Sequence, residues 1–598
     1  MKLRSTAILA AVLLLAACGG KDEPAVVTAA ESVDAAAELH ALFDEYASRT
    51  LDLNPLTATF IGVPGYNDRM ANSLGPEHIA ATTAFNEEFL QRLLEIDREQ
   101  LGYDDQVSYD IFRIERETDL EGDQFPGELQ PVNQFRLVTN FFVQLGSGAS
   151  AQPFKTVKDY EDFLARADDF VVLIDQAITN MKEGVREGVV QPRILVAKAL
   201  PQIDAHIVDD VADSNFYKPV ANMPEDFSAE DRERLTAAYE DKIMNTIIPS
   251  FERLSNFIGD DYLENARETV GLYAQPNGNA WYAYNVRAIT TTDMTPEEIH
   301  QIGLSEVARI HQEMHGVMEE VGFEGDLKEF FEYMNTDPQF FFDEPEQLIQ
   351  GYRDMADSIN EMATSLFDIF PKTDFEVRRV EPFREKSASG GSYMAGTTDG
   401  TRPGVFYANA YDLSARPNWA MESLYLHEAI PGHHFQIMIQ RENESLPDFR
   451  RYGGFTAFSE GWGLYAESLG KELGAYTDPY QYFGGLNAEL WRSIRLVVDT
   501  GIHAKGWTRQ EVLDYMYANS AVAEARAVSE AERFMAIPGQ ALAYKVGQLK
   551  IRAIRDDAEA RLGDQFDVKA FHRQVLQDGA MPLSMLEAKI DRWIESQL

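Results

Sequence analysis

A cluster of histidines near residue 430 is the part of this sequence best suited to chemistry. Three of the eleven histidines lie in the stretch LHEAIPGHH, which runs from Leu426 to His434. Histidine is the commonest metal ligand, and a glutamate beside the first histidine is typical of zinc peptidases, in which it acts as the base. The stretch therefore predicts a hydrolytic site in which His427 binds one zinc ion and Glu428 is catalytic.

The spacing of these histidines departs from the usual His-Glu-x-x-His pattern, because Pro431 stands where the second histidine is expected. In an ideal helix His433 is rotated by about 120° from His427, and His434 by about 20° but about 10 Å further along the axis. Proline also disfavours helix at the residue before it. We therefore expect a widened or broken turn. The second ligand is then His433, which follows glycine as in ordinary zinc peptidases. His434 is the alternative ligand. If His434 does not bind the metal, we expect it to contact the substrate.

The third metal ligand is expected to be a carboxylate on a following helix. Glu460 and Glu467 lie two turns apart on one face of the stretch FSEGWGLYAE, residues 458–467. Either glutamate could instead be a solvated surface residue. The flanking Gly461, Trp462 and Gly463 indicate a tightly packed interior, which favours Glu460 as the ligand. Two histidines and a glutamate, with the fourth position open, form the catalytic zinc pattern.

Several later residues are candidates for the substrate cleft. Asp499 and His503 share a helical face, so Asp499 could orient His503 toward a scissile carbonyl, although a buried structural pair is equally consistent. Tyr544 could donate to the oxyanion or be a core tyrosine. Substrate contacts are expected from His434, Arg402, Asp499 and Arg533. Arginines able to grip a carboxylate precede Tyr544 on helices: Arg492, Arg495, Arg526 and Arg533.

Two further patterns were weighed for function. Gly404 to Asn409 reads as a short strand, and an edge strand there could pair with an extended peptide. His311 and His315 are four residues apart on a helix, but the glutamate between them is not adjacent to the first histidine. The charge around this second pair is typical of an exposed face, so we expect no metal there.

The N-terminus has the pattern of an export signal. Lys2 and Arg4 precede a short apolar run from Ala7 to Leu15, and Leu15-Ala-Ala-Cys18 matches a bacterial lipobox. Residues 1–17 are the expected signal peptide, and 18–34 a tether lipidated at Cys18. By resemblance to other lipoproteins, Gly19 favours the outer membrane, facing the periplasm. The lipid is the only expected membrane contact, and the lone cysteine precludes an intramolecular disulfide.

The charge balance narrows the class of partner. The chain has 53 basic and 98 acidic residues, a net charge of −45. Such a charge argues strongly against nucleic acid and anionic lipid surfaces as partners. The expected partner is a peptide substrate.

Helical periodicity dominates the chain, so a mainly α fold is predicted. Apolar spacings of three and four residues indicate helices at 34–48, 82–99, 157–183, 228–257 and 344–369. Capping boxes at Thr295 and Thr508 begin two more. Strands are expected only at 375–380 and 404–409, as a small sheet inserted beside the active-site groove. We expect an N-terminal helical lobe at 35–280 and a catalytic metallopeptidase-like lobe at 281–598.

These motifs together resemble the bacterial lipoprotein family labelled domain of unknown function 885. The matching stretches are residues 399–404, 426–436, 458–467, 499–503, 538–541 and 544–545. That family is similar in fold to zinc carboxypeptidases of the carboxypeptidase Taq type, which implies a mostly helical protein with a deep groove. The resemblance implies peptidase chemistry more firmly than it implies which peptide.

The expected function is zinc-dependent hydrolysis of short peptides in the cell envelope, in a carboxypeptidase-like manner in preference to aminopeptidase or oligopeptidase action, which stay open. Two alternatives remain open at this point. One is a catalytically inactive lipoprotein that binds peptides. The other is a metal hydrolase of another amide, such as a cell-wall fragment. Retention of Glu428 beside His427 favours an enzyme, because a passive binder has no use for a base there.

Overall fold

Helices form most of the part of the chain that the computed structural model describes, residues 34–382, 385–386 and 388–598. The mainly α prediction is confirmed, with one small sheet. Cys18, the signal peptide and all of the tether except Asp34 lie outside the described residues. Within the described residues, no helix is long and apolar enough to cross a membrane.

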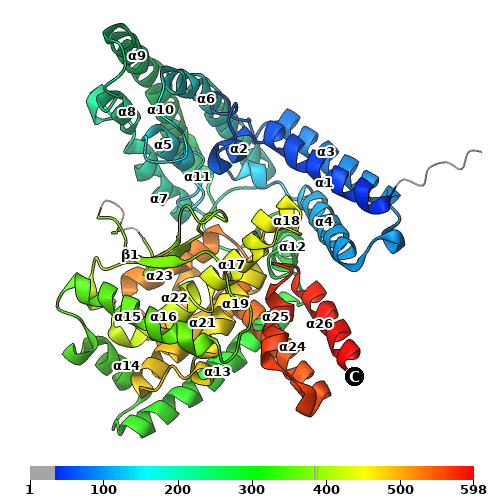
Figure 1. Cartoon of the computed structure of the whole chain (residues 1–598). Helices are drawn as coiled ribbons and strands as arrows, with labels where there is room; N and C mark the ends of the chain where they lie inside the picture. The colour runs from blue at the N-terminus through cyan, green and yellow to red at the C-terminus, as the bar shows by residue number, and fades with distance from the viewer. Residues whose placement is uncertain (1–33, 383–384, 387) are drawn as a thin grey trace, which may run out of the picture.

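The N-terminal helices, blue to teal in Figure 1, form the upper part of the molecule in that view. Their bounds are α1 (Ala35–Leu53), α2 (Pro55–Ile61), α3 (Pro76–Glu95), α4 (Tyr103–Gly122), α5 (Asn140–Gly146), α6 (Val157–Glu187), α7 (Arg193–Asp204), α8 (Lys218–Ala221), α9 (Ala229–Lys242), α10 (Ile248–Phe257) and α11 (Leu263–Asn265). One hydrophobic core is drawn entirely from residues 70–266 of this part. The boundary predicted at residue 280 falls inside α12 (Gly278–Thr290), and the two-lobe division itself stays a prediction.

The long helix α6 shows how sequence fixes these elements. Thr156 and Asp159 form a capping box at its start, and Gly188, at φ 74°, ends it in the left-handed conformation that favours glycine. Phe163, Phe170 and residues at matching helical spacings are buried along one face. The capping boxes expected at Thr295 and Thr508 are likewise present, at the starts of α13 (Pro296–Val321) and α22 (Arg509–Asn519).

The C-terminal half, green to red in Figure 1, contains the predicted site. Its other helices are α14 (Leu327–Thr336), α15 (Pro345–Ala363), α16 (Met421–Glu428), α17 (His433–Glu442), α18 (Asp448–Tyr452), α19 (Thr456–Ser468), α20 (Gly470–Leu473), α21 (Pro479–Lys505), α23 (Glu524–Ala536), α24 (Ala543–Leu562), α25 (Val568–Leu576) and α26 (Leu583–Gln597). The largest core in this half surrounds α16, α17 and α19, so the helices that carry the predicted ligands are anchored by buried apolar residues.

The sheet has three strands, in the order β1 (Phe375–Arg379), β3 (Gly404–Ala408), β2 (Gly391–Met394). β3 is parallel to β1 and antiparallel to β2. The expectation that the 404–409 strand lies at a free edge is therefore wrong: β3 is central, and all five of its residues are buried. Its backbone is already hydrogen-bonded on both sides and cannot receive a peptide as an added strand.

Helices α19 and α24 approach each other at a contact between two glycines. A Cβ on Gly461 would lie 2.4 Å from the Cα of Gly547, and a Cβ on Gly547 would lie 2.0 Å from the backbone oxygen of Ala457. Neither position can accept a side chain without separating the two backbones. Because Glu460 precedes Gly461 on α19, this contact also sets the depth at which that carboxylate enters the core.

We predict that Gly547→Ala lowers the free energy of unfolding by about 1–3 kcal/mol, the usual cost of overpacking a core. The matched control is Gly316→Ala in α13, where a Cβ meets nothing within 4 Å. That change should stabilise the protein by up to about 1 kcal/mol through helix propensity. Urea denaturation followed by circular dichroism measures both, and equal stability of the two variants would contradict the glycine contact.

Candidate metal centre

The helix that carries His427 is interrupted as the sequence predicts. α16 ends at Glu428, Ala429 and Gly432 have non-helical dihedral angles, and the Ile430–Pro431 peptide bond is cis. A Cβ on Gly432 would lie 2.0 Å from the backbone oxygen of His427, so only glycine fits there. α17 then begins at His433 in a new register, which returns this side chain to the side of His427.

His427, His433 and Glu460 converge on one point. The Oε2 atom of Glu460 lies 3.5 Å from Nε2 of His427 and 3.5 Å from Nε2 of His433. Ligand bonds of about 2.1 Å at tetrahedral angles place neighbouring ligand atoms about 3.4 Å apart. The arrangement therefore fits a zinc ion, and it is the one group of three or more such side chains found among the described residues. These three residues are the ones that the sequence predicts as metal ligands.

Glu467 holds the first of these histidines in place. The Nδ1–H group of His427 donates to Oε1 of Glu467 over 2.8 Å, so its Nε2 lone pair faces the metal position. The hydroxyl of Ser423 donates to the other carboxylate oxygen, and Arg492 Nη2 lies 3.3 Å from Oε1. Glu467 is 4% exposed. The spacing in the sequence places Glu467 on the same helical face as Glu460. Nothing in the sequence indicates that Ser423 and Arg492 contact Glu467.

The electrostatics of the site favour a cation. Burial lowers the pKa of His427, but hydrogen bonds to Glu460 and Glu467 outweigh burial and raise it to about 10. Burial raises the pKa of Glu460, yet the two histidines hold it well below its ordinary value. At neutral pH these shifts leave both carboxylates ionised and a proton on His427, and a divalent ion bound there would take the place of that proton.

Glu428 lies beside the ligands without joining them. It is the last residue of α16 and is 8% exposed, and its charge acts on both His427 and Tyr352. Among the described residues its carboxylate has no hydrogen bond and no ion pair. Its carboxylate therefore makes no pairing on which the described fold depends, and Glu428 remains a candidate for chemistry at this group.

His434 belongs to the sheet rather than to the metal centre. Its Nδ1 atom and the hydroxyl of Tyr393 are hydrogen-bonded at 2.9 Å, and its ring centre is 4.6 Å from that of Phe375. Burial lowers its pKa to about 4. The side chain is 1% exposed, so this placement does not support the expected substrate contact.

The pair Asp499 and His503 is fully buried and has structural partners. Leu272 donates its backbone N–H to Nδ1 of His503, and Nε2 of His503 donates to the backbone oxygen of Phe534, both over 3.0 Å. Asp499 does not orient His503 as expected, because it accepts from the Tyr282 hydroxyl and the Gly539 amide. Both ring nitrogens of His503 are occupied, so the catalytic role predicted for it and the substrate contact predicted for Asp499 have no support in this geometry.

The remaining predicted residues lie outside the group formed by His427, His433 and Glu460. Tyr544 is half-buried, its ring centre is 4.7 Å from the Arg495 guanidinium, and its hydroxyl has no hydrogen bond within the described part of the chain. Arg533 donates to Glu530 and Gln540, so it is already paired. Arg402 is exposed in the turn before β3. Of the two histidines on α13, His311 is half-buried and hydrogen-bonded to the Asn519 carbonyl, and His315 is exposed.

Residues 55–590 match the family described as "Bacterial protein of unknown function (DUF885)". The chain belongs to this family. The resemblance inferred from its motifs is thereby confirmed, and the match extends well beyond them into the N-terminal helices. No curated protein sequence matches the chain.

Two solved structures share the fold of this DUF885 chain, both described as a "putative lipoprotein". The one from Colwellia psychrerythraea is 27% identical, with a TM-score of 0.84 over 94% of this chain and 100% of that chain. The one from Shewanella oneidensis, "of unknown function", is 18% identical, with a TM-score of 0.73 over 92% and 99%. At 18% identity the likeness shows the fold alone.

We predict that His427→Ala, His433→Ala and Glu460→Ala each abolish the binding of one zinc ion, while His434→Gln retains it as the matched control. Glu467→Gln should weaken zinc binding by about 10–100-fold, because His427 loses its charged partner. Competition with a chromophoric chelator measures the affinity, and circular dichroism checks folding. Loss of zinc in His434→Gln but not in His433→Ala would reverse the choice of ligand.

Proposed function

We propose that this DUF885 chain is a zinc-dependent hydrolase of short peptides. The observation that carries the proposal is the buried, unpaired carboxylate of Glu428 beside the group formed by His427, His433 and Glu460. A zinc ion held by these three residues would supply a Lewis acid that polarises a carbonyl and makes a water nucleophilic near neutral pH.

The residues of this chain supply the proton transfers. Glu428 accepts a proton from the attacking water and gives it to the leaving amine, which a carboxylate without competing partners can do. Glu467 and Arg492 hold His427 in the tautomer that leaves Nε2 free. Tyr544, whose hydroxyl is unpaired, is the proposed donor to the oxyanion, and its ring lies 6.0 Å from the guanidinium carbon of Arg492.

A group of arginines beside this site supports recognition of a terminal carboxylate. Burial lowers the pKa of Arg526; the charge of Glu530 opposes this effect, and the charges of Arg492 and Arg416 lower the pKa further, so the three cations lie close together. Arg492 is paired with Glu467, but within the described residues neither Arg526 nor Arg416 has an ion pair. An anionic ligand would stabilise these two cations. A peptide with a free C-terminus provides one, as in a carboxypeptidase.

An inactive peptide-binding protein would fit this arrangement less well. Binding alone requires neither the isolated carboxylate of Glu428 nor an open position opposite three ligands. For location, we propose the cell envelope: lipidated Cys18 anchors the protein to the outer membrane, as Gly19 favours, and the chain faces the periplasm. Support comes from the lipobox and from the two lipoprotein-like structures that share the fold.

We predict that Glu428→Gln retains zinc but lowers kcat at least about 100-fold, since an amide cannot accept the proton. The matched control is Glu444→Gln, an exposed glutamate beyond the end of α17, which should keep full activity. Turnover of a quenched fluorescent peptide library and zinc content are measured on the same samples. An active Glu428→Gln protein would assign the base to another residue.

The mode of cleavage can be tested with blocked peptides. Amidating the C-terminus should abolish cleavage because the arginine group loses its anion, whereas acetylating the N-terminus should have no effect. Arg526→Gln should raise KM for the free peptide about tenfold or more, with Arg186→Gln on the exposed end of α6 as control. Mass spectrometry identifies the products. The opposite preference would indicate an aminopeptidase, and indifference to both blocks an endopeptidase.

A further inference from the structure

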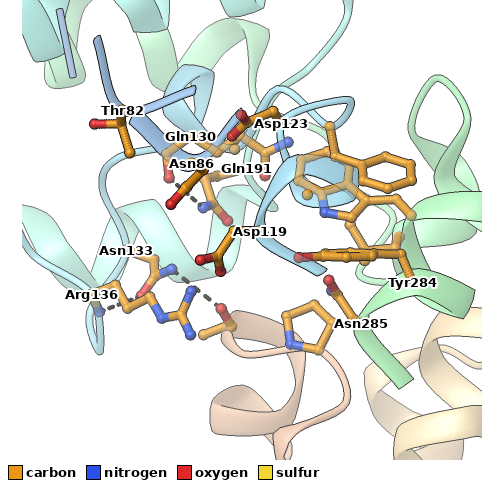
Figure 2. Close-up of a pocket in the computed structure, with 17 residues that line it drawn as sticks. Thr82, Asn86, Asp119, Asp123, Gln130, Asn133, Arg136, Gln191, Tyr284 and Asn285 are labelled. Carbon is orange, nitrogen blue, oxygen red and sulfur yellow. Dashed lines mark hydrogen bonds between the residues drawn. The ribbon is translucent and has the colours of Figure 1, made fainter. Parts of the chain in front are cut away.

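A cavity lies where the N-terminal helices meet the C-terminal half (Figure 2). Its volume is about 550 Å³, within the usual range for small-ligand sites. One side comes from α3, α4 and the segment at 123–136, and the other from α12 and the end of α23. None of the proposed metal ligands, nor Glu428, lines it, so it is separate from the proposed catalytic centre.

Asn86 on α3 brings an unpaired amide to the wall of this cavity. Its side chain is 6% exposed and makes no hydrogen bond within the described part of the chain. Figure 2 shows it on the same side of the cavity as Gln130 and Gln191 in that view. A buried amide without a partner costs free energy and is uncommon in folded proteins. Since the described fold offers Asn86 no partner, one has to come from the cavity itself.

Two more unpaired polar groups reach the cavity from α12. The side chain of Asn285 and the indole N–H of Trp281 make no hydrogen bond within the described residues. Figure 2 shows Asn285 across the cavity from Asn86 in that view. A ligand that pairs with both sides must therefore carry hydrogen-bonding groups around its rim rather than at one end. An amide both donates and accepts, and a hydroxyl group does the same, so the two can pair in either direction.

Aromatic rings form the wall on the α12 side. The rings of Phe125 and Trp281 are stacked with centres 5.9 Å apart, and the ring centre of Phe125 lies 5.2 Å from that of Tyr284. Because Phe125 already stacks on Trp281, these two rings leave no slot between them for a flat aromatic ligand. The face of an aromatic ring carries partial negative charge and attracts polarised C–H groups. This wall therefore suits the C–H face of a saturated, oxygen-bearing ring.

The charges around the cavity favour a neutral ligand. Asp119 is paired with Arg116 over 2.9 Å. Asp123 and Arg136 have no ion pair within the described residues, and both are exposed. Their charges are opposite, so a ligand of either sign that gains from one of them loses from the other. The net charge of −45 on the chain further disfavours a small anion.

We propose that this cavity binds a neutral mono- or disaccharide, with hydroxyl groups on Asn86, Asn285 and the indole N–H of Trp281, and the C–H face of a pyranose ring on the aromatic wall. A pyranose carries hydroxyl groups around its rim and C–H groups on its faces, which matches the two kinds of wall. Such a ligand has no peptide bond to cleave. Its binding therefore stands or falls independently of the proposed hydrolase activity.

The test is isothermal titration calorimetry of the full chain with maltose, cellobiose and diacetylchitobiose, with tryptophan fluorescence recorded in parallel. One of these disaccharides should bind saturably and change the fluorescence, and Trp281→Phe should remove that change. Asn86→Ala should weaken the binding about tenfold, the effect of leaving a ligand hydroxyl without its buried partner. The matched control is Asn245→Ala, an exposed asparagine of the N-terminal helices, which should keep the wild-type affinity.

Asn86→Ala should fold, because the described fold loses no hydrogen bond and alanine favours the helix α3. Thermal unfolding checks this, and Asn285→Ala is a second variant with the same expected loss of affinity. The proposal is overturned if none of the three disaccharides binds saturably, or if either folded variant keeps the wild-type affinity. It is also overturned if adenosine or free phenylalanine, tested as a nucleoside and a zwitterion, changes the Trp281 signal at lower concentration than the disaccharides do.

Discussion

The interruption between Glu428 and His433 is the feature on which the candidate site depends. A continuous helix would direct His427 and His433 to different faces, and no carboxylate on α19 could reach both. Gly432 lets the backbone pass against the carbonyl of His427, and Trp462 donates to the carbonyl of Pro431 over 2.7 Å. Gly463 lies so near the His427 ring that a Cβ would be 2.8 Å from it. α19 thus supports the break while it supplies Glu460.

The local part of this arrangement could be read from the sequence. Pro431 excludes a regular helix, and a glutamate followed directly by glycine, tryptophan and glycine indicates an interior position. Capping boxes and apolar spacing located most long helices because each of these signals depends on residues within a few positions of each other. β2 was missed because four residues, Gly-Ser-Tyr-Met, show no alternation, and the central place of β3 depends on strands distant in sequence.

The parts that sequence could not predict are those decided by neighbours from other elements. Spacing places Asp499 and His503 on one face of α21, but only the fold brings Tyr282 and Leu272 to them. The same limit applies to Ser423 and Arg492 around Glu467, because a serine and an arginine carry no signal of what they will meet. The sequence indicated Arg492 and Arg526 as candidates for binding a carboxylate, but not that Arg416 lies near them, since net charge says nothing about where single charges gather.

The candidate metal centre and the cavity between the N-terminal helices and the C-terminal half differ in the sequence separation of their residues. The three residues of the candidate metal centre all lie between residues 427 and 460, whereas the cavity in Figure 2 is lined by residues from Thr82 to Pro538. Contacts of low sequence separation form early because little loop entropy is lost in closing them, and distant ones form late. The ligand cluster can therefore assemble from one local stretch of chain, while the cavity exists only after both ends of the protein have docked. Its presence marks a completed fold.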